Sequence, residues 1–536
     1  MKKIYLKVVF TLFFAVSLVF ILLWLCPKII ASPLVSSSPG AAEENNKFSS
    51  RIEAAINAPR YKHSNWGIMI SDFSSGEVLY QLNSDKMFSP ASTTKLFTVA
   101  AAMDCLGAGY RFETPVYFKG ETAGSVLKGD LILAASGDLT MGGRTDANGG
   151  IAYTNADHSE ADAFQGKAEL TLQYPLAGLN SLARQVADLG IKKLQGDVVI
   201  DDRLFNEFQP KDKGADFVLS PIIINDNLID IEIAPAKQGE DAKVNWRPKS
   251  RAYSVKSYVK TVKGPGEIKI KSAGTREIIV TGSIAAGESP LVYTYQVKKP
   301  ASFARSLFIE ALKRAGVEVI APELAENPVW KLPKNYSGLQ RVALLKSPPF
   351  SENAKLILKV SHNLHADTLP LLIAVKNGRK TFEEGMALEK PFFASAGVDT
   401  DSISLSDGAG GSRSDFITPA AVTQLLRYMS TRPDFSAYYK ALPILGVDGT
   451  LVSVVDKNSP VRGMVYAKTG TIAAEDLLNG RGMLGAKALA GYMTASSGRK
   501  LIIAIYVNNV PIYSFDDVMM VGKDLGRICE IIYVSN

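Results

Sequence analysis

Three short motifs contain residue types that together could acylate a serine. They are, in chain order, Ser92-Thr93-Thr94-Lys95, Ser361-His362-Asn363 and Lys468-Thr469-Gly470-Thr471. A serine hydroxyl attacks a carbonyl carbon when a nearby base takes its proton, and a lysine with a neutral amine can be that base. A Ser-x-x-Lys pair alone is weak evidence, because average composition gives about two in a chain of this length. The combination of the three motifs predicts a serine nucleophile with a lysine base.

The first motif lies where a helix should begin. Apolar residues recur at helical spacing over 96–103, after the loop-like Phe88-Ser89-Pro90-Ala91, and Gly107 ends the run. Residues three apart share a helix face, so the Lys95 amine can reach the Ser92 hydroxyl. Burial and a second cation at Lys468 would disfavour the ammonium form of Lys95. In isolation, the same pattern fits a capping serine and a solvated lysine.

The third motif lies on an expected edge strand. Residues 464–472 have the β-branched and aromatic content of a strand, and Gly470 interrupts it where a side chain would block a ligand lying alongside. A peptide could add to that edge through backbone hydrogen bonds, with its carboxylate held by Lys468 and Thr469. The backbone N–H groups of Thr471 and Ser92 would form an oxyanion hole. The alternative interpretation is a polar strand end.

Five further segments resemble one enzyme family. They are Ser136-Gly137-Asp138, residues 196–202 with Phe205, the Ser-Asp-Gly-Ala-Gly-Gly-Ser-Arg run at 406–413, the Leu-Pro-Ile-Leu-Gly-Val-Asp-Gly-Thr-Leu run at 442–451, and Ala-Leu-Ala-Gly-Tyr at 488–492. With the three motifs, they resemble the D-alanyl-D-alanine carboxypeptidase/endopeptidase type of class C, low-molecular-mass penicillin-binding protein over nearly the whole chain after residue 45. The resemblance implies an α/β (α+β) fold, in which a transpeptidase/β-lactamase-like domain carries two nested, mainly β inserted domains.

The resemblance also implies roles for individual residues. In the family pattern, Ser361 relays a proton to the leaving amine, and Asn363 orients the substrate amide and the lysine. Arg413 and Asp201 lie in family-like segments and are candidate contacts to the substrate peptide, although each could equally belong to a structural ion pair. The implied activity is hydrolysis of D-Ala-D-Ala, or of D,D-cross-links, in peptidoglycan stem peptides through an acyl-enzyme. It implies inhibition by β-lactams, with no cofactor and no metal.

Other functions fit some of the same residues. A serine β-lactamase would use the same motifs, but no Glu-x-x-x-Asn deacylation segment is recognisable. A catalytically silent wall-binding module would have no use for a nucleophile and base. His362 and His365 could suggest a metal pair, yet no carboxylate or cysteine nearby in the sequence completes a ligand set. The polar segment Gly142–Gln165 is typical of a flexible loop, whose Asp157, Glu160 and Asp162 could bind a cation or simply be solvated.

The spacing of the motifs predicts an inserted region. Ser92 and Ser361 are roughly 270 residues apart, more than one compact lobe needs, and short strand-like runs fill the interval. We expect the peptidase domain over 47–110 and 340–536, inserted domains over 111–339, and the smaller, nested one around 225–300. The segment 473–487 reads as extra length in the hairpin after the third motif.

The amino terminus predicts export. Lys2, Lys3 and Lys7 precede an apolar run over 8–25, which fits a signal peptide or signal anchor over 1–31 followed by a linker over 32–46. The enzyme is therefore expected to act outside the cytoplasm, with possible membrane anchoring. A net charge of +7 comes from scattered Lys and Arg without an aromatic-interleaved stripe, which argues against nucleic-acid binding. Cys105 and Cys529 could form a disulfide in an oxidising compartment.

Overall fold

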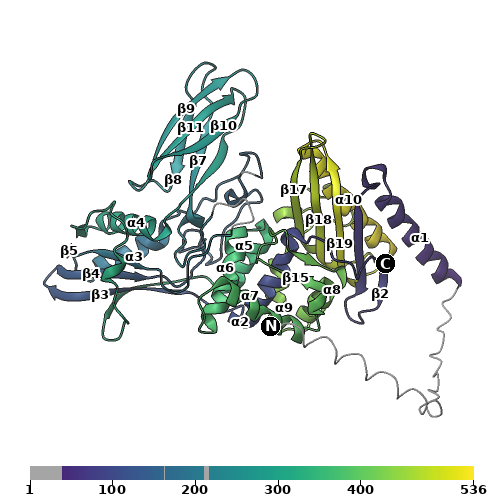
Figure 1. Ribbon diagram of the computed structural model, residues 1–536, viewed down its shortest axis with the longest axis horizontal. Coiled ribbons are helices and arrows are strands. Elements are labelled where there is room, and N and C mark those ends of the chain that lie inside the picture. The colour runs from purple at the N-terminus through teal and green to yellow at the C-terminus, as the bar shows by residue number, and fades with distance from the viewer. Residues whose placement is uncertain (1–38, 162, 211–216) are drawn as a thin grey trace, which may run out of the picture. The chain divides into compact units, whose positions relative to one another are not determined.

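The computed structural model describes residues 39–161, 163–210 and 217–536 (Figure 1). The expected signal or anchor over 1–31 lies outside the described residues, as does the first part of the linker, 32–38. Among the described residues, no helix is both long enough and apolar enough to cross a membrane. The chain divides into a part that ends at Lys47 and a part from Phe48 to Asn536, and the fold described below is that of the second part. Helix α1 (Pro39–Ile56) runs across this division.

An antiparallel five-stranded sheet combines the two ends of the chain. Its order is β17 (Val465–Asp476), β18 (Arg481–Thr494), β19 (Lys500–Ile512), β1 (Asn65–Asp72) and β2 (Val78–Leu82). Helix α10 (Phe515–Ser535) buries Ile528 and Ile532 against one face, in a core that includes Ile503 and Ile505. Strand β17, which carries the third motif, is an edge strand.

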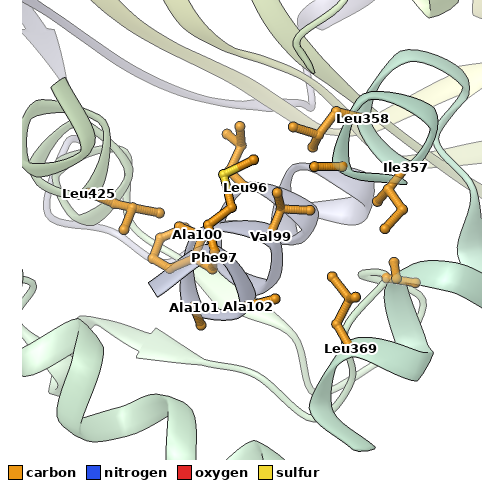
Figure 2. Close-up of a cluster of buried hydrophobic side chains, with 14 of the residues drawn as sticks. Leu96, Phe97, Val99, Ala100, Ala101, Ala102, Ile357, Leu358, Leu369 and Leu425 are labelled. Carbon is orange, nitrogen blue, oxygen red and sulfur yellow. The ribbon is translucent and has the colours of Figure 1, made fainter. Parts of the chain in front are cut away.

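A layer of helices covers the other face. It contains α2 (Lys95–Leu106), α5 (Phe350–Val360), α6 (Asn363–Lys376), α7 (Phe382–Ser395), α8 (Pro419–Ser430) and α9 (Phe435–Ala441). Every residue of α2 from Lys95 to Met103 is buried. Figure 2 shows Leu96, Phe97 and Val99 of this helix enclosed by side chains of α5, α6 and α8. A helix that is apolar all round must be enclosed in this way, so the start of α2 is held firmly.

Three further sheets lie between α2 and α5 in the sequence. The largest has the order β13 (Glu318–Val319), β5 (Lys193–Gln195), β4 (Val126–Ala134), β3 (Glu113–Ala123) and β14 (Gln340–Lys346), with β6 (Val198–Asp201) also paired to β4. Helices α3 (Ala177–Asp188) and α4 (Pro300–Arg314) share its core. Because β14 pairs with β3, the inserted sheet extends past the expected limit at residue 340.

The two smaller sheets span residues 228–296. One has the order β12 (Leu291–Gln296), β7 (Leu228–Ala234) and β8 (Lys243–Arg247). The other has the order β10 (Ile268–Ala273), β11 (Glu277–Ala285) and β9 (Ser254–Val262). They appear at the top of Figure 1 in teal. A two-stranded sheet of β15 (Ile403–Ser404) and β16 (Phe416–Ile417) completes the set among the described residues.

Two expectations from the sequence need correction, and the structure adds detail to a third. The segment from residue 142 is not a solvated loop, because Ile151, Asp157 and His158 are buried in its described part; Asp162 lies outside the described residues. The thiols of Cys105 and Cys529 are free, and they belong to different cores. The extra length at 473–487 is a continuation of β17 and β18, which stay paired up to residues 476 and 481.

Candidate active site

Ser92 and Lys95 lie at the junction between the short 3-10 turn Ala91–Thr94 and α2. The Lys95 side chain is fully buried. Its Nζ lies 2.9 Å from Ser92 Oγ, 2.7 Å from Asn363 Oδ1 and 2.7 Å from the carbonyl oxygen of Ala409. A neutral amine has two hydrogens and one lone pair. This set of neighbours, one hydroxyl and two carbonyl oxygens, matches an amine that donates twice and accepts from the serine.

A tight loop aims the Ala409 carbonyl at Lys95. The Asp407 carboxylate accepts hydrogen bonds from the backbone N–H groups of four residues, Ala409, Gly410, Gly411 and Ser412. Gly410 has φ +85°, and a Cβ there would lie 1.9 Å from the carbonyl oxygen of Ala91. The loop therefore packs directly on the serine turn. The sequence singled out this segment as family-like but gave no reason for it.

The second motif joins α5 to α6. Ser361 caps α5 with φ +67°, a left-handed conformation that is uncommon outside glycine and is often found at functional sites. Its Oγ accepts a hydrogen bond from Lys468 Nζ at 3.0 Å. Asn363 begins α6, and its Nδ2 donates to Glu160 Oε1 at 2.9 Å. The motif thus contacts both lysines, Lys468 through Ser361 and Lys95 through Asn363.

The third motif faces the other two from strand β17. Lys468 is fully buried, and its Nζ also donates to the carbonyl oxygen of Thr469 at 2.8 Å. Burial holds the pKa of Lys468 well below its usual value, and the charge that Lys95 carries when protonated lowers it further. Thr469 Oγ1 donates to Thr450 Oγ1 at 2.8 Å. Thr471 Oγ1 accepts from Lys487 Nζ at 2.9 Å, and burial lowers the pKa of Lys487 to about 8.

Gly470 is needed for a reason other than the one expected. A Cβ at this position would lie 2.4 Å from the carbonyl oxygen of Pro90 and 3.2 Å from the Cβ atoms of Ala91 and Ala488. The serine turn therefore crosses the edge strand at Gly470. The absence of a side chain lets these two backbones approach, which brings Ser92 beside the third motif.

The two candidate substrate contacts differ in their surroundings. The Asp201 carboxylate is in the inserted sheet, where it accepts from Arg203 Nε at 2.8 Å, Arg203 Nη2 at 2.7 Å and Tyr336 Oη at 2.5 Å. It is part of a structural ion pair. Arg413 follows the Asp407 loop, is exposed, and makes no ion pair with any residue that the structure describes.

Three of the four histidines of the chain meet at Asp226, next to the second motif. Asp226 Oδ2 lies 2.8 Å from His158 Nε2 and 3.3 Å from His362 Nε2, and Oδ1 lies 2.9 Å from His365 Nε2. No carboxylate lies near His362 and His365 in the sequence, but the fold brings Asp226 to both rings. Asp226 lies in a turn, Asn225–Asn227, whose three residues all have positive φ, which Asn and Asp tolerate better than most residues.

These side chains form a buried ion-pair network rather than an arranged metal site. Arg144 Nη2 lies 2.6 Å from Asp226 Oδ2, 2.7 Å from His158 Nε2 and 2.8 Å from Asp157 Oδ1, where a cation would otherwise lie. The rings of His362 and His365 are stacked, with centroids 3.7 Å apart and planes 11° from parallel. Their in-plane lone pairs cannot converge on one ion. We call Arg144, Asp157, His158, Asp226, His362 and His365 the histidine–aspartate cluster.

Comparison with known proteins decides the family. Residues 48–520 match the family model of the D-Ala-D-Ala carboxypeptidase 3 (S13) family. The chain belongs to this family. The D-alanyl-D-alanine carboxypeptidase of Actinomadura sp. (strain R39) is 27% identical over 502 residues, which cover 89% of this chain and 84% of the relative. DacB of Haemophilus influenzae is 24% identical over 464 residues, which cover 83% and 85%.

A solved structure has the same fold. Penicillin-binding protein 4 (dacB) from Haemophilus influenzae superposes with a TM-score of 0.67 at 22% identity, covering 90% of this chain and 99% of that chain. The expected penicillin-binding-protein family and the α/β, transpeptidase-like fold are confirmed. The S13 family member described here is a serine-type D-Ala-D-Ala carboxypeptidase.

Proposed function

We propose that this enzyme cleaves D-Ala-D-Ala, or a D,D-cross-link, in peptidoglycan stem peptides through an acyl-enzyme on Ser92. The observation that carries this proposal is the 2.9 Å contact between Ser92 Oγ and the buried Lys95 Nζ. A buried amine at this distance from the hydroxyl is placed to take the serine proton. No other described serine in the three motifs faces a lysine that is held in this way.

Acylation follows from these contacts. Lys95 takes the proton of Ser92 Oγ, which attacks the carbonyl carbon of the penultimate D-Ala. The backbone N–H groups of Ser92 and Thr471 stabilise the oxyanion. The C–N bond then breaks, and Ser361, hydrogen-bonded to Lys468, passes a proton to the amine of the leaving D-Ala. Water then attacks the ester carbon, the C–Oγ bond breaks, and Ser92 regains its proton.

Substrate binding uses the edge strand and the second motif. Lys468 and Thr469 hold the terminal carboxylate, and the peptide lies along β17 beside Gly470 and Thr471. Asn363 positions the acyl amide. Arg413 is exposed and makes no ion pair with any described residue, so it can contact the stem peptide. The carboxylate of Asp201 already accepts hydrogen bonds from Arg203 and Tyr336, so it is not proposed as a substrate contact.

β-Lactams should acylate the same serine. Penicillin-binding protein 4 from Haemophilus influenzae has been solved in complex with a β-lactam, and the ring carbonyl and carboxylate of a β-lactam resemble those of D-Ala-D-Ala. The test is to incubate the purified protein with a fluorescent penicillin and map the labelled peptide. We expect the label on Ser92. A label on another residue, or none on the folded protein, would contradict the proposal.

We also propose the place of action and the domain limits. Export through residues 1–31, by cleavage or as an anchor, would bring the enzyme to peptidoglycan. The peptidase domain would comprise 47–110 and the part after residue 346, with an inserted region over 111–346, since β14 belongs to the inserted sheet. A smaller domain around 225–300 is supported by the two three-stranded sheets at 228–296.

A further inference from the structure

A carboxylate of the inserted region, that of Glu160, contacts Asn363 in the active site. We propose that Glu160 is a positioning residue that fixes the side-chain amide of Asn363 for catalysis, leaving a single N–H of that amide for the substrate. This inference rests on the proposed function, because it assigns the remaining N–H to the acyl amide of the stem peptide. It concerns a residue whose segment lies outside the three motifs.

The hydrogen-bonding capacity of Asn363 gives the first argument. A primary amide has one carbonyl oxygen and two N–H groups. Asn363 Oδ1 lies 2.7 Å from Lys95 Nζ, and Nδ2 donates to Glu160 Oε1 at 2.9 Å. An ionised carboxylate only accepts hydrogen bonds, so Glu160 forces Nδ2 toward itself and Oδ1 toward the lysine. One N–H then remains.

The anchoring of Glu160 gives the second argument. Glu160 is the last residue of the 3-10 turn His158–Glu160. The first residue of this turn, His158, and the residue before it, Asp157, are buried in the histidine–aspartate cluster. Asp157 accepts two hydrogen bonds from Arg144, both at 2.8 Å, and also caps the turn through the N–H of Ser159. His158 Nδ1 lies 2.5 Å from Asp230 Oδ1. The turn is therefore anchored by Asp157, the residue before it, and by His158, its first residue.

The same cluster anchors the helix that carries Asn363. Asp226 contacts His158 in the turn and His365 in the first turn of α6, at 2.8 and 2.9 Å. Both partners of the bond between Glu160 and Asn363 are thus tied to one buried carboxylate. This arrangement fixes their separation, as positioning requires, since a misplacement of about 1 Å can cost roughly a hundredfold in rate.

The charge of Glu160 provides a second readout. Burial and three charged neighbours shift the pKa of Lys468. Burial, Lys95 and Lys487 lower it, and Glu160 raises it. Without the carboxylate, the pKa of Lys468 should fall further. If the ammonium form holds the substrate carboxylate, the alkaline limb of the pH profile should move to lower pH.

The experiment compares Glu160→Gln with a matched control in the full-length protein. Glu169→Gln makes the same change at an exposed site on the same segment. Penicillin acylation and D-Ala release are measured against pH. We expect Glu160→Gln to lower the acylation rate constant roughly ten- to a hundredfold and to shift the alkaline limb to lower pH, with Glu169→Gln at the wild-type level. If Glu160→Gln kept the wild-type acylation rate constant and the wild-type position of the alkaline limb, the inference would be overturned.

A double-mutant cycle tests whether Glu160 acts through Asn363. In an Asn363→Ala background, Glu160→Gln should cause little further loss, whereas an equal loss in both backgrounds would overturn the positioning role. Glu160→Asp keeps the charge but shortens the side chain, so it should lower the rate without moving the alkaline limb. It replaces Glu160→Gln if that variant does not fold. A folded wild type that neither acylates nor releases D-Ala would instead refute the proposed function.

Discussion

Adding one methyl group at Gly470 should inactivate the enzyme while leaving it folded. The new Cβ would lie 2.4 Å from the carbonyl oxygen of Pro90, a backbone atom. Ordinary contact requires a separation of about 3.5 Å, so the serine turn or the edge strand must retreat by about 1 Å. The turn carries Ser92, whose contact with Lys95 depends on its position. We expect acylation to fall roughly a hundredfold, and the free energy of unfolding to fall by about 1–3 kcal/mol.

Gly485→Ala provides the matched control. Gly485 lies on the neighbouring strand, and its Cβ would be 3.4 Å from Ile472 Cγ2, an ordinary contact. Stopped-flow acylation by a fluorescent penicillin and denaturant unfolding are measured on both variants and the wild type. The control should acylate at close to the wild-type rate. If Gly470→Ala also did so, the close approach of the turn to β17 would not position Ser92, and the reasoning from this contact would fail.

Three further results are expected. Lys95→Arg keeps the charge but cannot supply a neutral amine, so acylation should fall at least roughly a hundredfold in a folded protein; near-wild-type acylation would show that Lys95 is not the base. Burial and His365 lower the pKa of His362 to about 4, against about 6.5 when unfolded, so the unfolded state binds more protons between these values. The free energy of unfolding should therefore decrease as the pH falls from about 6.5 to about 4. When this free energy is measured by denaturant titration at several pH values, it should depend less steeply on pH in His362→Gln than in the wild type. An unchanged dependence on pH would assign the effect to another group. A reporter fused after residue 50 should be found outside the cytoplasmic membrane, and a cytoplasmic reporter would contradict export.

The sequence was informative where the chemistry is local. Ser92 and Lys95 are three residues apart on one helix, so their contact follows from helix geometry alone. The edge strand was recognisable because β-branched residues surround the third motif. The family-like segments indicated the fold, because they occur along nearly the whole chain.

The sequence was uninformative where the contacts depend on tertiary packing. Asp226 and Glu160 reach the second motif from two turns that are far from it in the chain, and no local pattern reveals that they meet there. For Asp201, the sequence left a substrate contact and a structural ion pair equally open. Its family-like segment suggested a substrate contact, but the guanidinium of Arg203, two residues later, and Tyr336 occupy its carboxylate. The sequence indicates that position 470 needs a glycine, but it does not reveal that a side chain there would meet the backbone of Pro90.

The pairing of β1 with β19 also determines when the enzyme can become active. Strand β1 precedes Ser92, yet its partner, residues 500–512, is among the last parts of the chain to be made. Until then the edge of β1 that pairs with β19 has no partner strand, and β18 lacks the strand that joins it to β1. Such long-range pairing is slow to form, so the growing chain stays in a state without the assembled site. If the chain is exported as proposed, it can be moved across the membrane before its serine is activated. A chain that stops before residue 500 lacks β19, the strand that joins β18 to β1.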